Sequence, residues 1–242
     1  MANIKYIQHY TFPGNFESIS TYCASQEYTI VTEVPWQSDY GTKFNNSNVT
    51  TRSGAYNIFD DKHIGKCQDL QDLLIFIRDS YSHYILNVLP RKNFENNTLT
   101  PSMMAWVNVL RANEAIGCHK HSDEYYAGLW SFVSGTMCLA AADTKTYYRY
   151  SQTTNDGVCW GSPDGEVFGQ EEVDNIPGRL TIFPPYYEHW TTAVHPEKSL
   201  GDLNKRVTLG FDILFHKSHA PDNDVFTNNL IDLPDYNLMS NS

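Results

Sequence analysis

The sequence predicts an all-β core, an antiparallel sandwich or barrel, preceded by an N-terminal α/β extension that carries at least one amphipathic helix. Two patterns lead to this fold class. Between Pro101 and His216, short runs of β-branched and aromatic residues alternate with Gly, Pro, Asn and Asp, as is typical of antiparallel strands joined by turns. Before Pro101, one stretch has apolar residues at steps of three and four, which indicates the buried face of a helix.

The composition is that of a folded protein. Hydrophobic residues make up 41% of the 242 positions and aromatic residues 14%, enough to build a core in a chain of this length. The 17 Lys and Arg and 28 Asp and Glu give a formal charge of −11, whereas nucleic-acid binding needs positive charge against phosphates. No apolar run approaches the roughly 20 residues of a membrane helix, and the N-terminus lacks the pattern of a secretory signal. We therefore expect a cytoplasmic protein with neither a nucleic-acid nor a membrane partner, and find no signal of its oligomeric state.

Shifts in composition divide the chain into three segments. We expect an N-terminal extension that packs on the core, the β core itself and an irregular tail, at residues 1–100, 101–217 and 218–242. The boundary near Pro101 follows a polar segment rich in Asn, and the tail contains Asn, Asp and two Pro. Such residues favour turns and irregular structure over helices and strands.

The N-terminal extension has two parts. Residues 1–66 mix aromatic residues with Asn, Ser, Thr and Gly, which predicts short strands and long loops. From Leu70 to Val88 the apolar residues recur with helical spacing, and Pro90 ends that helix.

The strand candidates of the core are separated mostly by Gly, Pro, Asn or Asp. They are MAWVNVL, EAIGCHKH, AGLWSFVSG, MCLAA, KTYYRYSQ, GRLTIFPP and RVTLGFDILF. A polar stretch at residues 153–177 connects two of them. Connections of that length in compact domains are usually functional or disordered.

The most informative residues are three histidines in the core. His119 and His121 stand two apart, and His189 comes much later, after GRLTIFPPYYE. Alternate residues of a strand point to the same face, so His119 and His121 share a face. A third imidazole from a distant strand would complete three ligands on one side of a metal ion and leave other positions open. The alternative is an incidental surface pair, and the apolar surroundings of the pair favour the metal site.

Three blocks of sequence contain these histidines and the strand that follows them. AWVNVLRANEAIGCHKHSDEYYAGLWSFVSG carries Trp-x-Asn, then H-x-H, then a small residue and Gly before an aromatic strand. GRLTIFPPYYEHWT matches G-x-L-x-x-F-P-x-x-x-x-H, and RVTLGFDI matches R-x-[ST]-x-x-F. In this order, from Ala105 to Phe215, the blocks resemble the Fe(II)- and 2-oxoglutarate-dependent oxygenases, in the prolyl-hydroxylase-like branch with an H-x-H motif.

The resemblance implies a double-stranded β-helix, or jelly roll, with Fe(II) at its open mouth. It implies that His119, His121 and His189 are the catalytic metal ligands, and that Arg206 and Thr208 bind the remote carboxylate of the cosubstrate 2-oxoglutarate. A planar guanidinium suits a carboxylate because it offers two parallel donors. The implied activity is hydroxylation of a small molecule or a protein side chain, with release of succinate and carbon dioxide. The substrate itself is not indicated.

The second metal ligand has an alternative. The usual triad of this superfamily has a carboxylate where His121 stands. Asp123 lies two residues further on, so a shift in register would make His121 and Asp123 the pair and leave His119 beside the site. We favour His121 because its spacing from His119 is that of the family's ligand pair.

Two other functions would use the same architecture. A cupin is a metal-binding jelly roll without 2-oxoglutarate, and its two motifs are partly matched by His119 to His121 and by the run from Gly178 to His189. Glu124 comes earlier than the usual cupin glutamate, so we favour the oxygenase over the cupin. A structural jelly roll whose histidines bind nothing is the third. The position of Arg206 separates the first two, because the oxygenase needs it inside the barrel and facing the metal.

Overall fold

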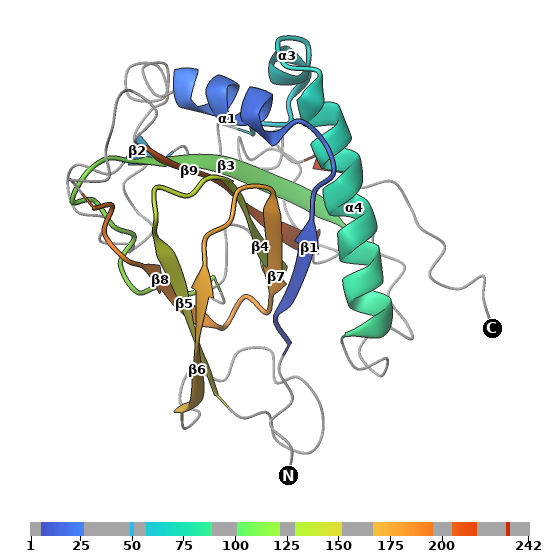
Figure 1. Cartoon of the computed structure of the whole chain (residues 1–242). Helices are drawn as coiled ribbons and strands as arrows, with labels where there is room; N and C mark the ends of the chain where they lie inside the picture. The colour runs from blue at the N-terminus through green and yellow to red at the C-terminus, as the bar shows by residue number, and fades with distance from the viewer. Residues whose placement is uncertain are drawn as a thin grey trace.

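The computed structural model describes residues 6–26, 49–50, 57–88, 101–121, 129–151, 167–195, 205–216 and 231–232. These residues form two antiparallel sheets and a layer of helices (Figure 1). The larger sheet has the order β1 (Gln8–Thr11), β7 (Arg179–Phe183), β4 (Leu129–Ala140), β9 (Arg206–His216), β3 (Ser102–Leu110) and β10 (Ile231–Asp232), with β2 (Val49–Thr50) also paired to β3. The smaller sheet has the order β6 (Val167–Asp174), β5 (Lys145–Ser151) and β8 (Glu188–Thr191).

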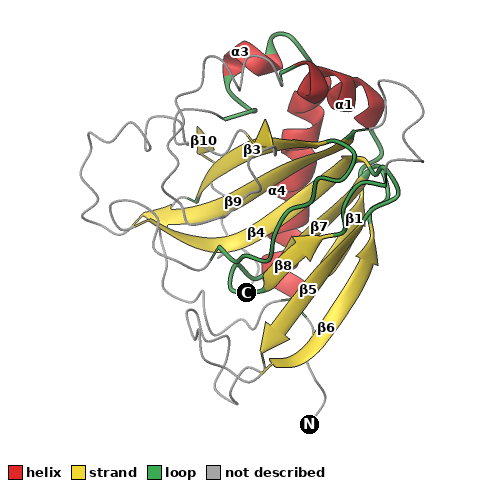
Figure 2. Cartoon of the chain, turned by 90° about the vertical axis from the view of Figure 1, so that its left-hand side faces the viewer, coloured by secondary structure: helices red, strands yellow, loops and turns green. Residues whose placement is uncertain are grey.

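The two faces of the larger sheet have different surroundings. One face packs against helices α1 (Phe16–Ser25) and α4 (Asp69–Asn87), and the other faces the smaller sheet (Figure 2). Residues of both sheets line a cavity. The apolar residues of β3 and β9 that meet the helices are Met103, Ala105, Val107, Val109, Val207, Leu209, Phe211 and Ile213. They alternate with residues that face the cavity, as the two-residue period of a strand requires. Two sheets around a central cavity are the architecture of a double-stranded β-helix.

The predicted long helix is confirmed as α4. Its buried residues include Leu70, Leu73, Ile77 and Tyr84, spaced by three, four and seven positions, so that they form one stripe against the sheet. The Tyr84 hydroxyl donates a hydrogen bond to the carbonyl of Tyr6 at 2.7 Å. None of the helices described is long and apolar enough to cross a membrane. The cytoplasmic location stays a prediction.

The prediction of strands and loops before residue 66 is wrong for two segments, which form α1 and the short helix α3 (Asp61–Ile64). Asn15 caps α1, because its side chain accepts a hydrogen bond from the backbone N–H of Ser18 at 3.2 Å. Ile19 and Cys23, four residues apart, are both buried. The helical spacing of this pair outweighs the β-branched and aromatic residues around it.

Several strand predictions in the core need correction. The described parts of AGLWSFVSG and MCLAA form one strand, β4, which runs through Gly135. The Phe211 ring occupies the place where a Cβ of residue 135 would lie, so this position requires glycine. The stretch EAIGCHKH is not a regular strand: His119 forms an isolated bridge to His189, and the backbone of Glu114, Ile116 and His121 makes single hydrogen bonds to the backbone of Val194, Thr191 and Pro185. The polar connection at 153–177 contains β6, and the strand β8 was not predicted. The part of that connection at 153–166 lies outside the described residues.

The segments on either side of the core add strands to its larger sheet. β1 pairs with β7, and β2 pairs with β3. The tail, predicted to be irregular, contributes β10, in which Ile231 pairs with Met103. The division of the chain at residues 100 and 217 stays a prediction.

Ile77 and Ile75 offer a matched test of how α4 packs. Ile77 is fully buried, whereas Ile75 on the same helix is 39% exposed. Ile77→Ala should lower the free energy of unfolding by about 2–5 kcal/mol, because it removes buried methyl groups and leaves a cavity. Ile75→Ala should change it by less than about 1 kcal/mol. Urea denaturation measures both values, and equal losses would contradict the packing described here.

Candidate metal centre

The backbone holds two of the three predicted ligands side by side. The N–H of His119 donates to the carbonyl of His189 at 3.1 Å, and the N–H of His189 donates to the carbonyl of His119 at 2.8 Å. The N–H of His121 donates to the carbonyl of Pro185 at 2.7 Å, in the Pro-Pro turn before β8. These bonds connect the segment that carries His119 and His121 to the segment that carries His189, without help from any side chain.

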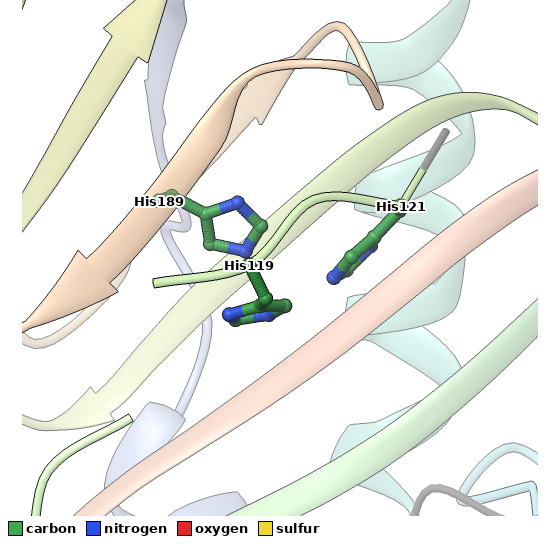
Figure 3. Close-up of side chains that lie close together, drawn as sticks. All are labelled: His119, His121 and His189. Carbon is green, nitrogen blue, oxygen red and sulfur yellow. The ribbon is translucent and has the colours of Figure 1, made fainter. Parts of the chain in front are cut away.

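The three imidazoles point toward one another (Figure 3). One nitrogen from each ring lies within 4.8 Å of the others, so the group could hold a metal ion. The ring centroids of His119 and His189 are 4.1 Å apart, and His121 lies 5.1 Å from the first and 4.9 Å from the second. The predicted convergence of the three side chains is therefore observed, although residues 119–121 do not form a regular strand.

Each imidazole has its Nδ1 beside an oxygen atom. Nδ1 of His119 lies 2.8 Å from the carbonyl of Gly117, and Nδ1 of His189 lies 3.1 Å from the carbonyl of Tyr187. A carbonyl only accepts hydrogen bonds, so both rings carry a proton on Nδ1, and in the neutral ring the lone pair is then on Nε2. This is the tautomer that binds a metal through Nε2.

His121 is the most deeply buried of the three, with 3% of its surface exposed. Its Nδ1 lies 2.8 Å from Oδ1 of Asp212 and 3.2 Å from Oγ of Ser134. Its ring packs against Trp106, with centroids 5.6 Å apart. Contacts on both sides of the ring therefore fix its orientation.

The histidines lie in a cavity with an empty volume of about 490 Å³, part of it continuous with solvent. Arg206 and Thr208 of β9 line the same cavity, together with Trp106, Asn108, Ile116, Gly135, Thr136, Thr146, Phe183 and Gly210. Arg206 and Thr208 are two residues apart on one strand and therefore share its cavity face.

Arg206 is a buried cation at this cavity. Only 2% of its surface is exposed, and no described residue accepts a hydrogen bond from its Nε or Nη1. Burial lowers the pKa of the guanidinium. Buried charged groups are costly unless a partner satisfies them, so the side chain fits an anionic ligand that enters the cavity.

Two buried polar residues next to His121 were not singled out from the sequence. They are Asp212 and Ser134, whose Oγ donates to Oδ1 of Asp212 at 2.5 Å. The signal for Asp212 was present, because it follows Arg206 and Thr208 at even spacing and is the only carboxylate in RVTLGFDILF. Asp123, the predicted alternative to His121 as the second metal ligand, lies outside the described residues.

Comparison with known proteins bears on the fold. No family model and no curated protein matches the sequence. A prolyl hydroxylase from Trichoplax adhaerens, solved with a peptide fragment of the hypoxia inducible factor oxygen degradation domain, has a TM-score of 0.51 and 13% identity, covering 87% of this chain and 84% of that one. A prolyl-4-hydroxylase from Pseudomonas putida has a TM-score of 0.49 and 9% identity, covering 87% of this chain and 93% of that one.

The chain has the prolyl hydroxylase fold. The predicted double-stranded β-helix is therefore confirmed, and the resemblance found in the sequence holds at the level of fold. Identities this low leave the chemistry to be argued from the residues of the site. Within the prolyl hydroxylase fold of this chain, those residues are the three histidines, Arg206 and their neighbours in the cavity.

Arg206→Met tests whether the buried guanidinium destabilises the ligand-free fold. The variant keeps the aliphatic part of the side chain and removes the charge, so it should raise the free energy of unfolding by about 1–3 kcal/mol. Arg149 is the control, because it is 40% exposed and pairs with Glu188 at 3.2 Å. Arg149→Met should change stability by less than about 1 kcal/mol. Urea denaturation without added metal or anion measures both, and a loss of stability in Arg206→Met would refute the argument.

Proposed function

We propose that this protein is an Fe(II)- and 2-oxoglutarate-dependent oxygenase that hydroxylates its substrate. The observation that carries the proposal is that three convergent imidazoles and the buried guanidinium of Arg206 line one cavity. The first group suits a divalent metal, and the second suits a carboxylate. A molecule with a chelating end and a remote carboxylate engages both groups at once.

His119, His121 and His189 would hold Fe(II) through Nε2. When bound, Fe(II) and 2-oxoglutarate supply the oxidising chemistry that adds an oxygen atom to a substrate C–H bond and releases succinate and carbon dioxide. The protein keeps the rings in place through their Nδ1 contacts. Ile116 and Phe183 add apolar surface to the cavity, which reduces the access of water to the reacting atoms.

Arg206 and Thr208 would bind the remote carboxylate of 2-oxoglutarate. The guanidinium offers its Nε and Nη1 donors, and the Thr208 hydroxyl is a further donor on the same face of β9. Thr136 and Thr146 also line the cavity, and their hydroxyls allow the carboxylate to be surrounded by neutral donors. Charge and hydrogen bonds together favour an anion at this position.

The location of Arg206 favours the oxygenase over a cupin. A buried guanidinium in the cavity of the three histidines suits the remote carboxylate of 2-oxoglutarate, whereas a cupin without 2-oxoglutarate has no such carboxylate to bind. A structural protein would gain nothing from Nδ1 contacts that leave three Nε2 lone pairs close together. The substrate class stays a small molecule or a protein side chain, and the peptide bound to the Trichoplax adhaerens enzyme supports testing peptides.

Turnover of 2-oxoglutarate tests the proposal. With Fe(II), ascorbate and oxygen, the protein should convert 2-oxoglutarate to succinate slowly alone and faster with a true substrate from a panel of peptides and small metabolites. The His189→Ala variant is the control and should form no succinate. Absence of succinate formation by the wild-type protein under all conditions, with iron bound, would refute the oxygenase assignment and favour the cupin.

The affinity for 2-oxoglutarate tests the role of Arg206. In the anaerobic Fe(II) complex, Arg206→Ala should weaken 2-oxoglutarate binding by about 100-fold, because a buried charge partner is lost, while iron affinity should stay within about threefold. The charge-transfer band of the complex reports the dissociation constant. An unchanged constant would show that Arg206 does not bind the cosubstrate.

Separate alanine variants identify the second metal ligand. His121→Ala and His189→Ala should both lose iron while keeping the folded core, and Asp123→Ala should retain it. Iron content after anaerobic loading, measured beside circular dichroism, gives the answer. If only Asp123→Ala loses the metal, the ligand set is wrong although the fold and the oxygenase class survive.

A further inference from the structure

We infer that Asp212 is a positioning residue of the metal centre: it fixes His121 and supplies the negative charge that three imidazoles lack. The inference rests on the proposed function, because it takes His121 as a metal ligand. Asp212 lies on β9 and is fully buried. Its Oδ1 lies 2.8 Å from Nδ1 of His121, so the carboxylate accepts a hydrogen bond from the ring and leaves Nε2 to the metal.

The three histidines differ in what holds Nδ1. The partners of His119 and His189 are backbone carbonyls of Gly117 and Tyr187. The partner of His121 is a carboxylate. His121 also stands at the position where the resemblance leads us to expect a carboxylate ligand. The one histidine with a carboxylate partner is therefore the one that replaces the expected carboxylate.

The charge of the site follows from this contact. A triad of two histidines and one carboxylate brings one negative charge to the metal, whereas three neutral imidazoles bring none. Asp212 supplies one negative charge to the site, although it contacts the ligand His121 and not the metal itself. A carboxylate bonded to a metal-binding imidazole also raises its basicity and fixes its orientation, so metal affinity should depend on Asp212 although it does not touch the metal.

The surrounding strands hold Asp212 in place. Ser134 Oγ donates to the same Oδ1 at 2.5 Å, and Ser131 Oγ lies 3.3 Å from Ser134 Oγ. Ser134 and Asp212 are direct partners in the pairing of β4 with β9. Because Ser134 is neutral, Ser134→Ala removes its hydrogen bond to Asp212 and its 3.2 Å contact with Nδ1 of His121 but keeps the negative charge, so it separates the effect of these contacts from the effect of the charge.

Titration of Co(II), which imidazole ligands also bind, gives the first test. Asp212→Asn keeps the size and polarity of the side chain and removes the charge. It should weaken Co(II) binding by about 10- to 100-fold, whereas Ser134→Ala should weaken it by less than about threefold. Visible absorption of the Co(II) protein reports binding, and thermal unfolding of each metal-free variant shows whether it has folded.

Azide binding to the Co(II)-saturated proteins gives the second test. If the role of Asp212 were purely structural, its replacement would not change the affinity for azide. Removal of a nearby negative charge should make azide bind Asp212→Asn on the order of tenfold more tightly. Ser134→Ala should bind azide like the wild type. Asp212→Glu retains the charge and should also show near wild-type azide affinity. If Asp212→Asn does not fold, the smaller neutral variant Asp212→Ser replaces it in both titrations, with the same expected changes.

Three results would overturn the inference. Wild-type affinities for both Co(II) and azide in Asp212→Asn would remove the role of Asp212 and leave the proposed function intact, because the metal still binds. Loss of Co(II) in Asp212→Asn with retention in His121→Ala would make Asp212 a direct ligand instead. Failure of the wild-type protein itself to bind Co(II) would refute the proposed function, and the inference with it.

Discussion

The site depends on the register of β9, the strand between β3 and β4. Its odd-numbered residues from Val207 to Ile213 pack in the apolar core, whereas the even-numbered Arg206, Thr208 and Gly210 face the cavity. A slip of one residue would exchange the two sets and bury the polar side chains in the core. Burial of apolar surface under the helices therefore determines where the guanidinium and Asp212 lie, although neither touches that core.

The site contains two buried charged side chains, Asp212 and Arg206, that affect the stability of the ligand-free protein in opposite ways. Asp212 is satisfied within the protein by Ser134 and His121, so it helps to fix the structure before any ligand arrives. Arg206 keeps donors without acceptors among the described residues, which costs stability until an anion binds. The first arrangement suits a preformed metal site, and the second suits a cosubstrate that enters and leaves.

Much of the fold and the site could be predicted where a pattern is local. The stripe on α4 and the alternation that places Arg206 beside Thr208 each follow from one element. His119 and His121 converge through pairing with His189 and Pro185, a long-range contact that no local pattern contains. For Asp212 the alternation of β9 was a local signal that the sequence analysis did not use, but its contact with His121, 91 residues away, appears only when the strands are assembled.

The positive charge of Arg206 and the negative charge of Asp212, both on β9, would also orient a charged ligand in the site. Arg206 and Asp212 are six residues apart, about 20 Å along an extended strand, with Thr208 and Gly210 between them. Under the proposed function, a dianionic cosubstrate placed with one carboxylate at Arg206 has its other end near the metal, where the charge of Asp212 offsets part of the charge of the ion. The remote carboxylate is then attracted more strongly by Arg206 than by the metal. The guanidinium therefore sets the orientation of 2-oxoglutarate, and the metal binds its other end. Three imidazoles alone would leave the metal end more attractive to any small anion, and Asp212 lowers that competition.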